Sequence, residues 1–397
     1  MTNRLSLLIL CAAVLPAALG CGTRGEAAAT WHGTMDTLPS GQIVVHNTAE
    51  PMWPEGSGWR LVEDLRIGTL EGDGPDLFGE IRSLEVDPAG RIFLLEAQAN
   101  EIRVFEADGS HIRTIGRDGG GPGEFNYPVL LQFGPEGNLW VVDPQNNRLS
   151  VFDSAGTYIE GKYALGGFIM MPWPGGFDYN GSYYAPVPLP RDDDFGIALV
   201  RFDVDLNPLD TIAIPEDPEE REGFELRNED SHLMAGIPFQ PGFRWRLSPT
   251  GTMWGMLDGD YRFFQLTLQG DTLRSFTREF EPLPVTEADM DQAREDLEWF
   301  INYGGNVDWS KIPDHKPATD DFFFDDEGNI WVIPVTMAEQ DWQVVEVFDP
   351  EGRYLGRIDV PFRLTRPYPV IRNGVMYAVV EDEMEVPYVV RARIEKP

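Results

Sequence analysis

The fold of this chain is indicated most clearly by residues 121–156, which read GPGEFNYPVLLQFGPEGNLWVVDPQNNRLSVFDSAG. Short runs of alternating aromatic and aliphatic residues follow turns that are rich in Gly, Asn and Asp. Glycine supplies the positive φ that a tight turn needs, and alternation of this kind favours a strand with one buried face. The stretch therefore predicts successive β-hairpins.

The same pattern of a turn ending in glycine and then an apolar strand occurs six times along the chain. The turn glycines are Gly90, Gly137, Gly181, Gly251, Gly328 and Gly374. A second strand-and-turn segment follows each of the first two glycines by 15 residues, at Phe105 and at Phe152. Two hairpins, or four short strands, on a period of about 45 residues are typical of one β-propeller blade. We expect an all-β, six-bladed propeller.

Particular residues of this stretch resemble the blades of NHL-repeat proteins. They are the run from Gly121 to Phe125, Pro128, Gly137, Asp143, the run from Asn146 to Arg148, and the run from Val151 to Gly156. The resemblance extends over about residues 59–397. It implies a six-bladed propeller of the kind often found on bacterial exported proteins, and it says little about chemistry.

Closure of the ring follows from a count of the strands. The sixth blade, residues 370–394, has sequence for three strands, and residues 59–67 form an isolated alternating segment without a hairpin partner. Because an open sheet edge is a liability, we expect this segment to be the fourth strand of blade six. The propeller domain would then span residues 58–397.

The N-terminus predicts export. Arg4 precedes a 15-residue apolar run from Leu5 to Leu19, which is too short to span a bilayer. The run ends in Ala18-Leu19-Gly20-Cys21, which resembles a bacterial lipobox, so residues 1–21 are interpreted as a signal with Cys21 as the lipidated residue. Residues 22–57 are expected to be a tether of low order. Conventional cleavage near residues 27–29 is the alternative.

Composition excludes several classes of protein. The formal net charge is −35, from 66 acidic and 31 basic residues, which argues against a nucleic-acid partner. The two cysteines are Cys11 and Cys21, so the body of the protein has neither disulfides nor a cysteine-based zinc site. We expect a monomer in the bacterial cell envelope, facing the periplasm or the surface.

Insertions distinguish blades three to five from the others. Successive turn glycines are 47, 44, 70, 77 and 46 residues apart, and the two long intervals each place about 25–30 extra residues between one blade and the next. Both insertions, residues 215–243 and the segment that follows blade four, emerge on one face of a propeller. The second predicts a short helix that begins after Thr286 and ends before Gly304. We expect its apolar stripe to lie on this face, either as packing or as a lid.

The predicted ligand-binding residues lie at this face. Arg82, Arg244 and Arg246 are at the starts of inner strands, and Trp173, Arg191 and Trp342 are on loops. Arginine and aromatic residues are frequent anchors of binding surfaces. The alternative is that the inner arginines pair with neighbouring aspartates and have a structural role. Glu96 and Asp143 occupy equal positions in blades one and two, which favours a turn-stabilising role.

A metal site is the second interpretation. His232, His315, Asp320 and Asp321 offer ligands that suit a divalent cation such as calcium, and they would support a hydrolase, lactonase or lyase at the channel mouth. The first interpretation remains non-enzymatic binding of an envelope protein, a peptide or a glycan without a cofactor.

Overall fold

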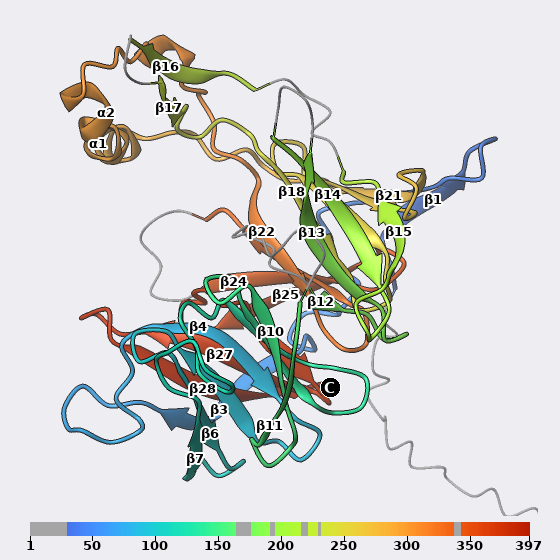
Figure 1. Cartoon of the computed structure of the whole chain (residues 1–397). Coiled ribbons are helices and arrows are strands. Elements are labelled where there is room, and N and C mark those ends of the chain that lie inside the picture. The colour runs from blue at the N-terminus through green and yellow to red at the C-terminus, as the bar shows by residue number, and fades with distance from the viewer. Residues whose placement is uncertain (1–29, 164–175, 191–194, 216–220, 229–231, 337–342) are drawn as a thin grey trace, which may run out of the picture.

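Six sheets, antiparallel apart from one parallel pair of strands, form a ring around a central axis (Figure 1). The computed structural model describes residues 30–163, 176–190, 195–215, 221–228, 232–336 and 343–397. In four of these sheets the strands follow one another in chain order, the other two also contain strands from the N-terminal region, and the first repeat strands of several neighbouring sheets contact one another. These first strands are therefore the inner strands of the ring. The expected all-β, six-bladed propeller is confirmed.

Blades one to three contain four strands each. Blade one consists of β4 (Ile81–Val86), β5 (Ile92–Glu96), β6 (Glu101–Phe105) and β7 (His111–Ile115). Blade two consists of β8 (Leu130–Phe133), β9 (Leu139–Asp143), β10 (Arg148–Phe152) and β11 (Tyr158–Lys162). Blade three consists of β12 (Gly176–Phe177), β13 (Tyr183–Pro190), β14 (Phe195–Phe202) and β15 (Pro208–Ile212).

Blades four to six contain the same four-strand motif, and strands from the N-terminal region extend blade four and complete blade six. Blade four consists of β18 (Phe243–Leu247), β19 (Met253–Leu257), β20 (Arg262–Leu266) and β21 (Thr272–Arg278), extended by β2 (Ile43–Asn47) and β1 (Gly33–Thr37). Blade five consists of β22 (Thr319–Phe324), β23 (Ile330–Pro334), β24 (Gln343–Phe348) and β25 (Tyr354–Val360). Blade six consists of β26 (Val370–Arg372), β27 (Val375–Glu381), β28 (Pro387–Glu395) and β3 (Arg60–Ile67).

Each of the six junctions between neighbouring blades has its own buried apolar cluster. Phe93 of blade one and Leu131 of blade two belong to one of these clusters, and Trp331 of blade five and Ile371 of blade six belong to another. The cluster between blades six and one closes the ring. β3 pairs antiparallel with β28, so the segment expected to close blade six does occupy its fourth position.

The expectation of a tether of low order over residues 22–57 is wrong for residues 33–47. β1 and β2 form a hairpin in which β2 pairs in parallel with β21, on the outer edge of blade four. The hairpin projects from the ring at the right of Figure 1. Val45 is fully buried in the cluster between blades four and five, and burial of this kind fixes a segment that sequence composition alone presents as polar and loop-like.

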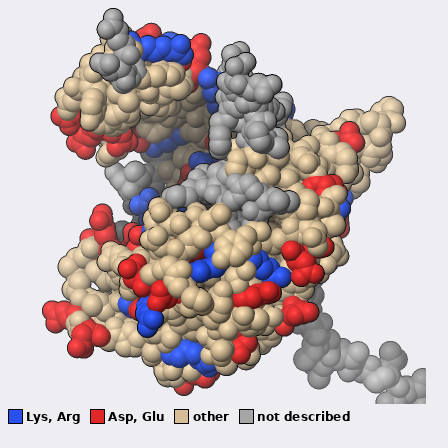
Figure 2. Space-filling model, in the orientation of Figure 1, with Lys and Arg blue, Asp and Glu red and all other residues tan. Residues whose placement is uncertain are grey.

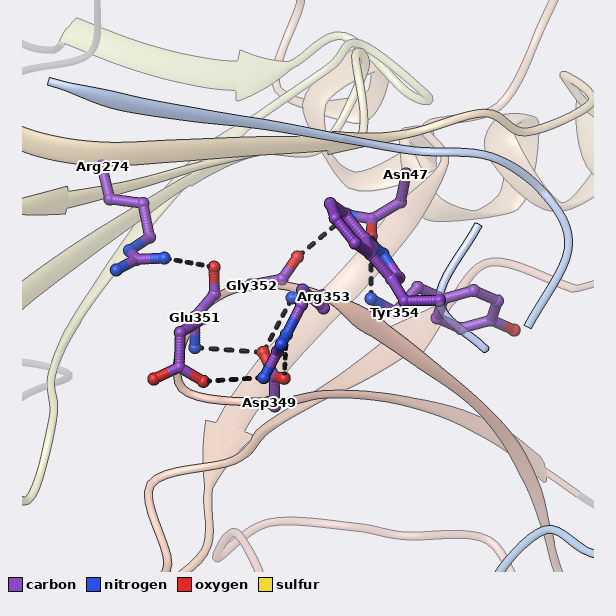
Figure 3. A network of polar contacts seen from close by, with 8 residues as sticks. Asn47, Arg274, Asp349, Glu351, Gly352, Arg353 and Tyr354 are labelled. Atoms are coloured by element: carbon purple, nitrogen blue, oxygen red, sulfur yellow. Dashed lines mark hydrogen bonds and ion pairs between the residues drawn. The ribbon is translucent and has the colours of Figure 1, made fainter. Parts of the chain in front are cut away.

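Asn47 fastens this hairpin to the ring (Figure 3). Its side-chain amide donates to the carbonyl oxygens of Thr277 (3.1 Å) and Gly352 (2.9 Å), and its Oδ1 accepts from the Trp31 indole N–H and the Tyr354 backbone N–H, both at 2.8 Å. One buried side chain thus connects the N-terminal hairpin with blade four and with the β24–β25 turn of blade five.

Candidate functional site

The two long insertions fold together into one lobe that stands apart from the six sheets (Figure 1). The lobe consists of β16 (Gly223–Arg227), β17 (His232–Gly236), α1 (Glu287–Asp296), α2 (Glu298–Asn302) and the short 3₁₀ helix Trp309–Lys311. Its core contains Phe224, Leu297 and Phe300, which belong to different insertions. Phe224 and Leu297, which are 73 positions apart in the sequence, therefore share one small core.

The helical insertion between blades four and five is confirmed, but its expected docking surface is wrong. Thr286 and Asp289 form the capping box that begins α1. The apolar stripe, with Ala293 and Phe300 buried, packs on the β16–β17 hairpin and not on the ring, and Ile301 is 43% exposed. The first insertion supplies the apolar surface that the helix needs, so the helix does not have to lie on the blades.

A short two-stranded stalk holds the base of the lobe above the ring. The backbone N–H of Val285 donates to Asp314, and that of Lys316 donates to Leu283. The Lys316 ammonium forms a 2.6 Å ion pair with Asp289, which is in the first turn of α1, and both side chains are largely buried. The stalk therefore fixes the position of α1 relative to the start of β22.

Two β-bulges lie in inner strands, one in blade one and one in blade five. In β4 the register shifts between Ile81 and Ser83, and in β22 it shifts between Thr319 and Asp321. The additional residues are Arg82 and Asp320. Bulges leave one residue outside the ladder and change the direction of its side chain. Blades one and five thus present an arginine and an aspartate at the same level of the ring.

Arg246 and Asp321 are tightly paired across blades four and five. The Arg246 guanidinium donates to the Asp321 carboxylate at 2.6 Å and to the Phe322 carbonyl oxygen at 2.6 Å. The Tyr368 hydroxyl donates to the same carboxylate, and the guanidinium lies 4.1 Å from the centre of the Tyr368 ring. Arg246 therefore has the structural pairing that the sequence left open as an alternative.

Arg244 and Arg366 are held more loosely at the same mouth. The Arg244 guanidinium is 3.6 Å from Asp320 and the side chain is 40% exposed. The Arg366 guanidinium is 3.8 Å from Asp321 and the side chain is 68% exposed. Because these two side chains are exposed and weakly paired, they are accessible to a ligand, although the Nε atom of Arg244 is itself buried.

Arg82 lies in blade one, across the ring from Arg244, and its side chain is held by several contacts. It donates to Glu80 at 2.9 Å and to the Pro128 carbonyl oxygen at 3.1 Å, and it lies 4.4 Å from the centre of the Tyr127 ring. This contact joins blade one to the segment that enters blade two. Of the three arginines expected at the mouth, Arg244 is thus the one whose guanidinium is least engaged by neighbouring groups.

A pocket of about 420 Å³ lies where both insertions return to the ring between blades four and five. Its walls are formed by Phe239, Gln240, Gly242, Phe243, Arg244, Asp258, Lys316, Pro317, Thr319, Asp320 and Val335. Asp258 is 4% exposed, and burial raises the pKa of its carboxyl group to about 6, although the Gly242 N–H, Arg244 and Arg221 oppose the change.

Asp258 is the blade-four counterpart of Glu96 and Asp143. Glu96 accepts from the N–H groups of Gly79, Glu80 and Ala99, and Asp143 accepts from those of Asn126, Tyr127 and Asn146. These bonds agree with the turn-stabilising role that their equal positions favour. Asp258 accepts from one backbone N–H within the described residues, that of Gly242, and it also faces a pocket. In blade four, the carboxylate at this position therefore both stabilises the backbone and lines a pocket.

The four predicted metal-ligating residues are spread over three places. His232 lies at the start of β17 in the lobe beside Arg227 and Glu225, and His315 lies in the stalk. Asp320 and Asp321 lie at the mouth and pair with arginines. Across the described parts of the chain, no three His, Cys, Asp or Glu side chains gather in a group that could hold a metal ion.

Other predicted residues cannot be placed. Trp173, Arg191 and Trp342 lie outside the described residues, as does Cys21. None of the helices in the described ranges has the length and apolar character required to cross a membrane.

Sequence reasoning missed Asp258, Arg366 and Tyr368. A signal for Asp258 was present, because it follows Gly251 by seven residues where Glu96 and Asp143 follow their turn glycines by six. The sequence repeat gives no signal for Arg366 or Tyr368, because both residues lie in the loop that connects blade five to blade six.

The comparisons with known proteins concern the fold. The family model DUF5128, described as a 6-bladed beta-propeller, matches residues 67–164. A search of curated proteins found no match. Among solved structures, a Bacteroides fragilis protein described as exported has 11% identity and a TM-score of 0.49, and the alignment covers 89% of this chain and 100% of that one.

Two further solved structures have a similar extent of overlap. A DUF4221 family member from Bacteroides vulgatus has 12% identity and a TM-score of 0.49, with 86% of this chain and 99% of that chain covered. Virginiamycin B lyase from Staphylococcus aureus has 10% identity and a TM-score of 0.43, with 85% and 100% covered. The family match and the ring of six sheets together identify the chain as a six-bladed β-propeller.

Proposed function

We propose that this propeller is an exported, lipid-anchored, non-enzymatic protein that binds an envelope protein, a peptide or a glycan between its lobe and its channel mouth. The observation that carries the proposal is the convergence of the two insertions into one lobe on the side of the ring where Arg244 and Arg366 lie exposed. A ring of blades needs no such lobe for its own stability, and insertions of this kind commonly serve binding.

The charged side chains between the lobe and the ring support binding at this face. Figure 2 shows a hollow between the lobe and the ring, with Lys and Arg side chains on its walls. The molecule as a whole carries a formal net charge of −35, and on this face the Arg244 and Arg366 side chains are exposed. Exposed arginines next to aromatic rings such as Tyr368 are typical binding anchors. Asp321, by contrast, is already neutralised by Arg246, which favours binding over the metal-dependent alternative.

The anchor is the second part of the proposal. Eight residues separate Cys21 from Thr30, the first described residue, and the nine steps from one Cα to the next reach at most about 30 Å. The N-terminal hairpin is fixed to blade four, so a lipid on Cys21 would hold the body close to the membrane surface. We expect Cys21→Ala to move the protein from the membrane fraction to the aqueous fraction.

The binding proposal is tested by retention of envelope components on the immobilised full chain. The mouth variant Arg244→Ala/Arg366→Ala is compared with a control that removes two exposed arginines of blade six, Arg60→Ala/Arg393→Ala. We expect at least one component to bind the wild type and the control and to lose about tenfold in affinity for the mouth variant. Equal retention by both variants would contradict the proposal.

A further inference from the structure

The pocket between blades four and five has an unusual balance of polar groups. Arg244 is paired with Asp320, and Lys316 is paired with Asp289. Asp258 adds a carboxylate, and its charge is opposed by Arg221 and Arg244. The pocket therefore has almost no net charge, while it offers carboxylate acceptors and guanidinium and amide donors within one small volume.

Within the described residues, Asp258 accepts fewer backbone hydrogen bonds than its counterparts in blades one and two. A carboxylate has about four acceptor positions, and the equivalent groups in blades one and two fill at least three of them with N–H donors. Asp258 accepts from the Gly242 N–H, and a Cβ atom at Gly242 would come within 2.7 Å of its Oδ2. Glycine at this position thus keeps the space beside the second carboxylate oxygen open.

Aromatic rings form the apolar part of the wall. Phe239 and Phe243 line the pocket, and Phe239 has a φ of 59°, in the left-handed region that bulky residues rarely adopt. The surrounding structure must maintain this backbone conformation, and it directs the Phe239 residue to the wall of the pocket. The Phe243 ring lies against Gly255, where a Cβ atom would be only 2.8 Å away.

A second pocket extends the first toward the outer rim. It has a volume of about 580 Å³ and shares Pro317 and Val335 with the first pocket. Its floor includes the ion pair of Arg278 with Glu346, at 3.1 Å. Each volume lies within the range of about 300–1,000 Å³ that is common for small-molecule sites.

We propose that the first pocket binds one sugar ring of a glycan, and that the second pocket accommodates the adjoining part of the chain. This inference rests on the proposed binding function and specifies its ligand class. Sugar hydroxyl groups donate and accept together, which matches the mixed carboxylate and guanidinium groups, and the apolar face of a sugar ring matches Phe239 and Phe243. A charged peptide side chain would instead meet a pocket whose charges are already balanced.

The test uses the full chain in detergent and a panel of defined tetrasaccharides of glucose, xylose, mannose and N-acetylglucosamine, with saturation-transfer NMR and calorimetry as the measurements. An unrelated set of acidic and basic pentapeptides is the competing probe. We expect at least one tetrasaccharide to bind, and Phe243→Ala to weaken it by about tenfold or more. The matched control is Phe133→Ala, which alters a pocket elsewhere on the ring.

Asp258→Asn provides a second variant that preserves shape. An ionised carboxylate offers both oxygens as strong acceptors, whereas protonation turns one of them into a donor and weakens the other, so we expect wild-type affinity to fall below pH 6 and the variant to lose this pH dependence. Asp320, Arg244 and Arg221 are the charged groups that influence the pKa of Asp258, and all three are unchanged in both the Asp258→Asn and the Phe243→Ala variants.

Three results would overturn the inference. They are the absence of binding by every tetrasaccharide, binding by the peptides alone, and equal affinity in wild type and Phe243→Ala. If envelope components are lost in the Arg244→Ala/Arg366→Ala variant while these results are obtained, the proposed binding function stands and the sugar pocket is refuted.

Discussion

Replacement of Asn47 by alanine tests how the N-terminal hairpin holds blades four and five together. The side chain is 3% exposed and takes part in four hydrogen bonds (Figure 3). The alanine variant leaves the Tyr354 N–H and the Gly352 carbonyl without partners in a buried environment. The Trp31 and Thr277 groups are only partly buried and can turn to water.

The magnitude follows from the two buried groups. Each unsatisfied group costs about 1–3 kcal/mol, so we expect a loss of about 4 kcal/mol in the free energy of unfolding. With an unfolding entropy of about 2.1 cal/mol/K per residue, a chain of this length has about 0.8 kcal/mol/K, and the Tm should fall by about 5 °C.

The assay is thermal unfolding at pH 7, followed by circular dichroism. Asn180→Ala is the matched control, because Asn180 is exposed in a turn and surface changes usually stay within about 0.5 kcal/mol. Asn47→Asp keeps the acceptor and places a carboxylate oxygen against two carbonyl groups, so it should be at least as damaging as alanine. The reasoning is refuted if Asn47→Ala melts within 1 °C of the Asn180 control.

Three further outcomes are expected. The raised pKa of Asp258 means that the folded state holds this proton more tightly than the unfolded chain, whose value is 3.8, so wild type should gain stability relative to Asp258→Asn as the pH falls from 7 to 4 in urea titrations. Arg246→Ala should destabilise by about 3 kcal/mol, because it leaves the buried Asp321 carboxylate without its cation, and Arg246→Ala/Asp321→Ala should recover part of this loss in the same assay. Thr286→Ala should cost about 1 kcal/mol and increase hydrogen exchange in α1 without altering exchange in the blades.

Most of the fold could be predicted from the sequence, because the blade repeat is visible in its turns and strands. Each turn from Gly90 to Gly374 directs a local hairpin, and local hairpins need no information from distant residues. Six equivalent units then have one simple closed arrangement, in which the isolated strand at residues 60–67 completes the last sheet. The N-terminal hairpin was missed because β2 pairs in parallel with a strand more than 200 residues away.

The candidate site was predictable only in part. Arg244, Arg246, Asp320 and Asp321 were identified individually from their positions at the starts of inner strands. Which arginine is tightly paired and which is accessible depends on the contact between β18 of blade four and β22 of blade five and on Tyr368 from a loop, and neither can be inferred from one strand's sequence.

The sequence by itself determined the blade count, the strand order and the places where the ring is interrupted, because glycine turns and alternating strands are properties of short segments. The tertiary structure alone decided that the two interruptions share a core, that Asn47 joins the N-terminus to blade five, and that Asp258 faces a pocket. These features depend on contacts between residues far apart in the chain, whose formation is favoured by burial in the closed ring and not by any local preference.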